Sequence, residues 1–306
     1  MTERLADISA RIDSVRQLDS VVTAMRGIAA SRAQQSRNLF QGIEAYSEAI
    51  SLAIGATLNF MTRPARAVEP PSDGHALIAF CAEHGFAGGL SDRILEAAAA
   101  MASDAHLIVV GTRGGIIASE RGLVVRRTIA MATQIGAVPE VANIVADTLY
   151  EQIVAGAVAR ADILYPRFDV GRDMRIERTV LFPIELEKFR RPASALPPLV
   201  TLPPDRLIER LAAEYVYAKL CEAAMLAFAA ENQARMETMS AASTNIERTL
   251  GELKQSENLV RQEAVTAEIV ELAAGSQTSM QSHHSRRLHQ TTSDHAAGLL
   301  DTDPTS

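Results

Sequence analysis

Large aromatic side chains, cysteines and long apolar runs are scarce or missing in this sequence. Tryptophan is absent and aromatic residues make up 4% of the 306 residues, whereas an enzyme core of this size normally uses more of them. The two cysteines, Cys81 and Cys221, lie too far apart for a metal-binding or redox motif, and we expect both to be reduced packing residues. No apolar run approaches the ~18 residues that cross a membrane. Because Met1 leads directly into a helical pattern, we expect an intracellular protein without a signal or transit segment.

Acidic residues are missing from Ser20 to Ile43, although the whole chain has a formal net charge of −7. Arg26, Arg32 and Arg37 fall within this window. Solvated helices normally mix both signs of charge, so the window is either a basic collar that faces an acidic partner or a solubilising helix face. The negative net charge and the lack of a basic aromatic platform argue against a nucleic-acid partner.

Apolar residues instead recur at coiled-coil spacing near both ends of the chain, at steps of about 3.5 residues. The first stripe comprises Leu5, Ile8, Ile12, Val15, Leu18, Val22, Met25 and Ala29. The second follows Pro203 and Pro204 and comprises Leu207, Leu211, Ala218, Cys221, Met225, Phe228, Met239, Ala242, Ile246, Leu250 and Leu253. A helix over 3–58 would be roughly 80 to 85 Å long, and one over 205–274 about 105 Å. The stripes therefore predict a long antiparallel two-helix coiled coil formed by residues 1–62 and 205–275.

In the middle of the chain, residues 75–190, the spacing of apolar residues no longer follows the coiled-coil pattern. Buried-strand patterns at 75–81 and 106–111 flank a helical pattern at 91–102, which is the spacing of a βαβ unit. A third strand is expected at 124–130, a helix at 139–160, and a hairpin of 161–168 and 175–184 around residues 171–173. The fold class is therefore α/β: a small open, Rossmann-like head of about five strands, inserted between the two helices through linkers at 63–74 and 191–204.

Two glycine-rich turns raise the alternative of a nucleotide-binding enzyme. Residues 85–90 (GFAGGL) follow a strand and precede a helix, where phosphate can bind, and residues 112–115 (TRGG) have the same character. Neither turn matches G-x-G-x-x-G or G-x-x-x-x-G-K-[ST], and no lysine stands at either helix start. Gly111 and Thr112 occupy the strand end where a dinucleotide site needs Asp or Glu. A tight strand-to-helix turn is the favoured interpretation, so we expect no catalytic residue, cofactor or metal site.

Residues 276–306 lose the apolar stripe and are rich in Ser, Thr, His and Asp. This composition predicts a disordered polar tail. Its histidines, His283, His284, His289 and His295, are the one cluster of possible metal ligands. Histidines on a polar tail more often bind nothing, which is the favoured interpretation.

Three stretches, in order, resemble the gamma subunit family of F-type rotary ATP synthases. Residues 21–32 (VVTAMRGIAASR) are similar to the family's first-helix signature, and residues 84–91 (HGFAGGLS) to its head-loop Gly-Leu-Cys-Gly-Gly-Leu-Asn. Residues 231–245 and 258–270 are similar to its C-terminal signature. The likeness covers about residues 2–275, while Gly27, Ala87 and Glu257 depart from the pattern. These departures indicate a divergent branch, such as a complex encoded by an alternate operon.

The resemblance implies a central rotor stalk, the non-catalytic subunit of an ion-translocating ATP synthase or ATPase, with one copy per complex. Its implied partners are alpha and beta subunits around the coil, with the epsilon subunit and the membrane c-ring at the head. Its implied location is peripheral, on the cytoplasmic side of a bacterial inner membrane. The implied rotor–stator contact residues are Met25, Arg26, Arg32, Arg37, Arg235, Arg261, Gln262, Thr266 and Glu268. Besides the nucleotide-binding enzyme, a non-rotary coiled-coil scaffold remains an alternative, which would explain the stripes but not the motifs.

Overall fold

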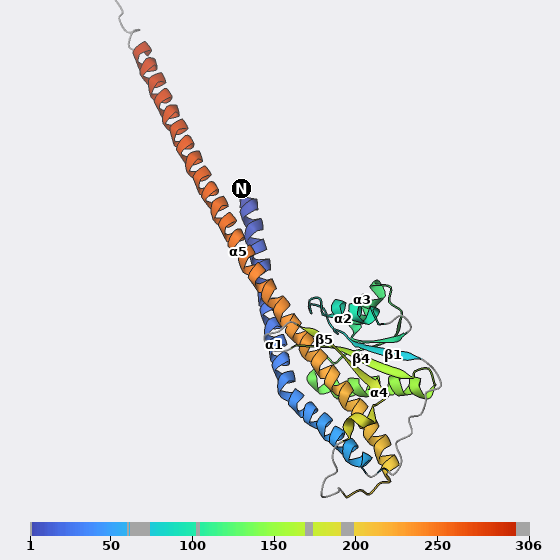
Figure 1. The fold of residues 1–306 in the computed structure, drawn as a ribbon. Coiled ribbons are helices and arrows are strands. Elements are labelled where there is room, and N and C mark those ends of the chain that lie inside the picture. Colours follow the sequence, from blue (N-terminus) through green and yellow to red (C-terminus); the bar gives the residue numbers. More distant parts are fainter. Residues whose placement is uncertain are drawn as a thin grey trace, which may run out of the picture. The chain divides into compact units, whose positions relative to one another are not determined.

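The computed structural model describes residues 2–59, 61, 74–101, 105–168, 174–190 and 199–297 (Figure 1). Its elements in chain order are α1 (Thr2–Leu58), β1 (His75–Phe80), α2 (Leu90–Ala99), β2 (Ala105–Val110), α3 (Thr112–Glu120), β3 (Val125–Ile129), η1 (Ile135–Ala137), α4 (Val138–Val154), β4 (Arg160–Arg167), β5 (Arg175–Phe182), η2 (Leu186–Phe189) and α5 (Pro204–Ala297). The chain divides into two compact units, one of residues 22–242 and one of residues 1–21 with 243–306. None of the described helices combines the length and apolar character needed to cross a bilayer.

The unit of residues 22–242 contains a five-stranded sheet in the order β3-β2-β1-β4-β5. β1 pairs in parallel with both β2 and β4, β2 pairs in parallel with β3, and β5 closes the sheet antiparallel to β4. β1 is buried at every position after His75, as is typical of a parallel strand covered on both faces. The predicted five-stranded α/β sheet is confirmed, and the turn predicted at 171–173 lies outside the described residues.

Helices cover both faces of this sheet. Alternate residues of a strand point to opposite faces, so each strand contributes side chains to two separate cores. Ile78 and Phe80 pack in one core with α4 and with α5 between residues 216 and 228. Leu77 and Ala79 pack in a second core with α2 and α3. Cys81 and Cys221 are both free and buried, in different cores, which confirms that they are reduced packing residues.

Within the same unit, α1 and α5 run antiparallel. The Tyr46 hydroxyl donates to Glu214 Oε2 at 2.5 Å. Further along α1, Ile54 and Leu58 pack against Ile208. Residue numbers therefore increase along α1 in the direction in which they decrease along α5. The pair follows the antiparallel arrangement that the two apolar stripes predict.

The second unit is a two-helix coil built from the start of α1 and the part of α5 that begins at Ser243. Ile12 and Val260 are each 3% exposed, because they occupy the apolar seam between helices. The Ser9 hydroxyl donates to Glu257 Oε1 at 3.1 Å. Glu257, one of the departures from the family pattern, thus joins the two helices of the coil.

The structure differs from the sequence expectations at two elements. Helix α3 was not expected, because Gly114 and Gly115 weaken its helical pattern. Helix α5 runs to Ala297, whereas a disordered tail is predicted from residue 276; no proline interrupts residues 205–303, and adding a residue to an existing helix is far easier than starting one. The tail histidines lie beyond the residues whose side chains the structure describes, and residues 62–73 and 191–198 of the predicted linkers lie outside the described residues.

Gly114 provides a test of the core between α3 and the sheet. A Cβ added at Gly114 would lie 2.1 Å from Cys81 Cβ, whereas one added at Gly42 of α1 would meet nothing within 4 Å. We expect Gly114→Ala to lower the free energy of unfolding by about 2 kcal/mol through overpacking. The control Gly42→Ala should raise it by up to ~1 kcal/mol, because alanine favours helix. Urea denaturation followed by circular dichroism measures both; a stable Gly114→Ala variant would contradict the packing.

Candidate functional site

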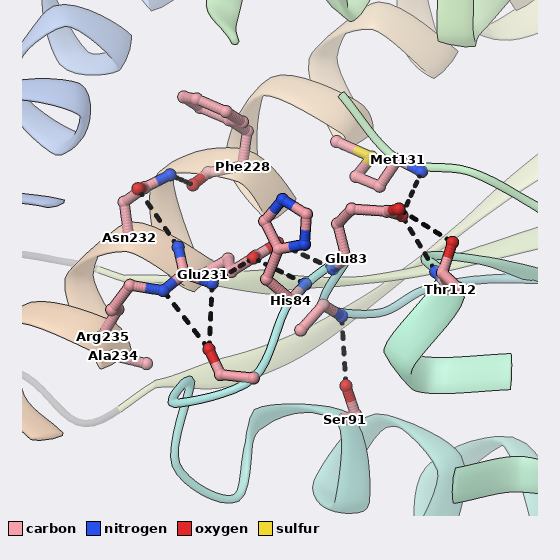
Figure 2. Close-up of polar contacts among 12 residues, drawn as sticks. Glu83, His84, Ser91, Thr112, Met131, Phe228, Glu231, Asn232, Ala234 and Arg235 are labelled. Atoms are coloured by element: carbon pink, nitrogen blue, oxygen red, sulfur yellow. Dashed lines mark hydrogen bonds and ion pairs between the residues drawn. The ribbon is translucent and has the colours of Figure 1, made fainter. Parts of the chain in front are cut away.

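An open α/β sheet usually binds ligands at the carboxyl edge of its parallel strands, near the point where the strand order reverses, which here lies between β1 and β4. Both glycine-rich turns of the sequence lie at this edge, after β1 and after β2. In this protein α5 reaches the same edge and places Glu231 and Arg235 against the loop that leaves β1 (Figure 2). The site is therefore a junction between a helix and the head.

Glu231 holds the backbone of this loop. Its side chain is buried, and its two carboxylate oxygens accept hydrogen bonds from the Glu83 N–H at 2.9 Å and the His84 N–H at 3.2 Å. Arg235, one helical turn further along α5, forms an ion pair with the same carboxylate. A buried charge is tolerated when it is paired and hydrogen-bonded, and Glu231 has both kinds of partner.

Arg235 is the one predicted contact residue that is buried, with 7% of its surface exposed. Its Nε and Nη2 donate to the Gly85 carbonyl at 3.3 and 3.2 Å, and its Nη1 donates to Asn232 Oδ1 at 3.4 Å. Asn232 Nδ2 in turn donates to the Phe228 carbonyl at 2.8 Å. The guanidinium group is thus engaged inside the chain, and its burial distinguishes Arg235 from the other predicted contact residues.

Glu83 joins the same loop to α3 and to the end of β3. Its carboxylate accepts from the Thr112 N–H at 2.9 Å, the Thr112 hydroxyl at 2.8 Å and the Met131 N–H at 2.7 Å. Burial by itself raises the pKa of the Glu83 carboxyl, but these hydrogen bonds outweigh it and hold the pKa below its ordinary value of 4.5. Glu83 is therefore an ionised structural residue at neutral pH.

The amide groups that a phosphate would need at the start of α3 are already used. The Thr112 N–H donates to the Glu83 carboxylate and the Arg113 N–H to the Glu83 carbonyl. The Gly114 N–H donates to the Ala82 carbonyl and the Gly115 N–H to Gly111. Phosphate binding at a helix N-terminus depends on unpaired N–H groups, so this turn does not support the nucleotide-binding alternative.

Four of the predicted contact residues lie on α1 within the 22–242 unit. Met25, Arg26 and Arg32 are half-buried and Arg37 is exposed. Arg37 Nη2 donates to Gln34 Oε1 at 3.2 Å. None of these three arginines forms an ion pair with a carboxylate of the described residues, so no described carboxylate compensates their charge.

The other four predicted contact residues lie together on α5 in the second unit, and all are exposed. Arg261 Nη2 donates to Glu257 Oε1 at 3.2 Å, and the Thr266 hydroxyl donates to the Gln262 carbonyl at 2.8 Å; Glu268 is the fourth of these residues. The same segment exposes large apolar side chains that the sequence reasoning missed: Leu259, Val265, Ile269, Val270 and Leu272. These apolar residues do not belong to the coiled-coil stripe, and that departure from the spacing is the sequence signal that could have identified them as exposed.

Sequence reasoning also missed the roles of Glu83 and Glu231. Glu83 comes directly after the buried β1 pattern, and Glu231 interrupts an apolar stretch of α5 after Ala230. An acidic residue in either position is a signal for a buried, hydrogen-bonded carboxylate. Within the described ranges, no group of three or more His, Cys, Asp or Glu side chains is arranged to hold a metal ion.

Comparison with known proteins places these features in a family. The family model described as ATP synthase matches residues 4–278. The ATP synthase gamma chain of Azoarcus sp. strain BH72 is 25% identical over 283 residues, covering 88% of this chain and 97% of the relative. The ATP synthase gamma chain of Beutenbergia cavernae is 27% identical over 286 residues, covering 87% and 94%.

Solved structures share the fold. A chain in the cryo-EM structure of the Euglena gracilis mitochondrial ATP synthase, OSCP/F1/c-ring, aligns with a TM-score of 0.61 and 14% identity, covering 100% of this chain and 99% of that one. A chain of the rotor structure from the same organism aligns with a TM-score of 0.60 at 14% identity, covering 87% and 100%. At this identity the likeness concerns the arrangement of the helices and the sheet.

Glu231 is the first residue to test at the junction. We expect Glu231→Ala to lower the free energy of unfolding by about 3 kcal/mol, because it leaves the buried Arg235 charge and two loop amides without their acceptor. Hydrogen exchange at the Glu83 and His84 amides should speed up. The matched control is Glu237→Ala, an exposed glutamate on the same helix, which should leave both measurements nearly unchanged. Equal effects of the two substitutions would show that Glu231 does not hold the loop.

Glu83 should make stability depend on pH. Since its pKa in the folded protein lies below 4.5, its contribution is fully present above the unfolded pKa and is lost as pH falls through the folded pKa. Glu83→Gln should therefore be less stable than the parent at neutral pH, and the difference should narrow below pH 4.5. Urea denaturation over this pH range tests the sign; a difference that stays constant with pH would contradict it.

Proposed function

The chain belongs to the ATP synthase gamma-chain family and is a central-stalk subunit, and from this premise we propose that it transmits rotation between an ion-driven membrane ring and catalytic alpha and beta subunits. The observation that carries the proposal is the family match over residues 4–278, which takes in α1, the sheet and most of α5. Long continuous helices suit this role, because a rigid element can pass a displacement from one end to the other. The chain supplies the mechanical link and the chemistry takes place on its partners.

We propose that alpha and beta subunits contact the exposed face of α5 around residues 259–272. Leu259, Ile269 and Val270 are each about 60% exposed there, and exposed apolar patches mark interaction surfaces. Arg261, Gln262, Thr266 and Glu268 provide polar groups on the same segment. A surface that mixes apolar and polar groups can be held by a surrounding partner while it still turns.

The basic window on α1 is the second proposed contact with the catalytic subunits. Arg26, Arg32 and Arg37 lack carboxylate partners among the described residues, and no acidic residue occurs from Ser20 to Ile43. Charges of this kind attract an acidic surface and contribute through partly exposed ion pairs, each worth about 1 kcal/mol or less. This supports the basic-collar interpretation over a solubilising helix face, with Met25 as its apolar neighbour.

The remaining assignments follow from the family. We propose that the head meets an epsilon subunit and the c-ring, that one copy of the chain serves each complex, and that the protein is peripheral on the cytoplasmic side of a bacterial inner membrane. The Euglena gracilis assembly whose chain shares this fold contains F1 and a c-ring. We also propose that the branch is divergent, since the curated relatives compared above are 25% and 27% identical to this chain.

Reconstitution tests the proposal and the basic window together. The unaltered chain should assemble with the alpha and beta subunits of its own organism, and the complete complex should pump ions on ATP. Arg32→Glu with Arg37→Glu should weaken pumping severalfold, and the loss should depend on salt because exposed ion pairs are screened over about 8 to 10 Å. Two substitutions are needed, since each pair is weak.

The control for this experiment is Arg126→Glu with Arg127→Glu, an equal change of charge on the exposed part of β3. It should leave the coupling to alpha and beta unchanged. Equal pumping by the Arg32 and Arg37 variant at every salt concentration would assign these arginines to a solvated face. Failure of the unaltered chain to assemble would overturn the proposed function, and ATP turnover by the isolated chain would favour the nucleotide-binding alternative.

A further inference from the structure

Strand β3 forms one edge of the sheet and has β2 as its single neighbour among the described strands. The Ile129 carbonyl accepts from the Gly111 N–H at 2.7 Å, so the backbone groups of Ile129 point toward β2. Because successive residues of a strand direct these groups to opposite sides, those of Thr128 point away from the sheet. Thr128 is also exposed. Its N–H and C=O are therefore open to pairing with a further strand.

Positive charge gathers at this edge, although the whole chain has a formal net charge of −7. Residues 112–139 contain one acidic residue, Glu120, and four arginines: Arg113, Arg121, Arg126 and Arg127. Arg126 is exposed, and no carboxylate of the described residues pairs with it. Arg127 Nη1 lies 3.7 Å from Glu151 Oε2, in an ion pair whose side chains are 51% and 73% exposed. A long, solvated pair of this kind is weak, so both arginines of β3 can engage a partner's carboxylates.

Apolar side chains flank the same edge. Val124, directly before β3, is 89% exposed, and Ile116 of α3 is 46% exposed. Ile116 follows Gly115, where an added Cβ would lie 2.7 Å from Thr128 Cγ2, so this part of α3 lies against β3. When an extended segment adds to a sheet edge, main-chain hydrogen bonds give affinity and neighbouring side chains give specificity. The β3 edge supplies both kinds of contact.

We propose that the β3 edge docks an extended acidic segment of a protein partner, which adds a strand to the sheet. The carboxylates of the segment pair with Arg126 and Arg127, and its backbone bonds to Thr128. A second copy of this chain does not fit, because pairing β3 with β3 sets arginine against arginine, and like charges on facing strands destabilise the pair.

This docking site goes beyond the proposed function and uses none of the residues assigned above to the alpha and beta contacts. Pumping by a reconstituted complex that lacks the partner therefore does not depend on Arg126 and Arg127.

The first experiment measures binding of a fluorescent peptide to the full chain by anisotropy. The peptide alternates glutamate and valine over about eight residues, a usual strand length. It should bind saturably, and more weakly at high salt. Arg126→Gln with Arg127→Gln should weaken binding about tenfold, through the loss of two exposed ion pairs. The matched control, Arg206→Gln with Arg210→Gln, removes equal charge from exposed positions of α5 and should bind like the unaltered chain.

The second experiment separates strand addition from charge attraction. Thr128→Pro removes the outward N–H, and an edge strand tolerates proline where its N–H side faces solvent. The thermal midpoint should therefore stay nearly unchanged, while affinity for the peptide should fall up to about tenfold. If this variant unfolds, the peptide is instead N-methylated at every second amide, which keeps its charge and removes its donors. Binding of the methylated peptide to the unaltered chain should fall by a similar factor.

Each outcome bears on the docking site. The absence of saturable binding by the acidic peptide would overturn it, and equal binding of the plain and methylated peptides would show charge attraction without strand addition. Edge strands also carry charges that prevent unwanted pairing. If Arg126→Gln with Arg127→Gln keeps its affinity and sediments as a dimer, the arginines serve that purpose and the docking site is wrong. No measurement here involves alpha or beta subunits, so failure of the docking site leaves the proposed function standing.

Discussion

A buried ion pair on one helix, Glu231 with Arg235, organises the junction between α5 and the head. It lies where the sheet's strand order reverses, at the edge that other α/β proteins use for ligands. Its hydrogen bonds go to three consecutive residues of one loop, Glu83, His84 and Gly85. A buried pair of this kind contributes little net stability compared with an apolar replacement. What it provides is a set of fixed hydrogen-bond partners for the backbone of this loop.

The second carboxylate, Glu83, extends this arrangement across the sheet. Through Thr112 and Met131 it connects the end of β1 to the start of α3 and to the residues after β3. The turn that could have bound phosphate is filled by the protein's own acidic side chain. The sheet resembles that of nucleotide-binding proteins, but here it has a structural role. The edge where such sheets usually bind ligands is the edge that contacts α5.

The two long helices serve different purposes along their length. In the unit of residues 22–242, α5 is buried against the sheet and its side chains belong to the head's core. In the other unit, among the residues whose side chains the structure describes, the helices pack through a narrow seam that includes Ile12, Ile246 and Val260, and most other side chains are half-buried or exposed. Under the proposed function this surface contacts the catalytic subunits, and that role would account for the mixture of charged, polar and apolar side chains on it.

The sequence by itself determined which segments form helices and strands, and that the two long helices run antiparallel. Apolar stripes at coiled-coil spacing predicted the helices of α1 and α5. Short buried runs predicted β1 and β2, a third strand was expected at 124–130, and alternating residues predicted the hairpin of β4 and β5. Three ordered motifs identified the family. These features depend on local patterns of side chains, which a sequence displays directly. The sequence did not predict α3, because two glycines hide its pattern, nor the continuation of α5 to Ala297.

Only the tertiary structure decided the roles of Glu83, Glu231 and Arg235. Arg235 was expected on a partner contact; in the structure 7% of its surface is exposed and its guanidinium group bonds to residues of the same chain. Glu231 and Glu83 are far apart in the sequence, and their shared loop becomes visible only when α5 reaches the carboxyl edge of β1. Hydrogen bonds between such distant residues follow from the packing of helix on sheet, and no local pattern of residue types records them.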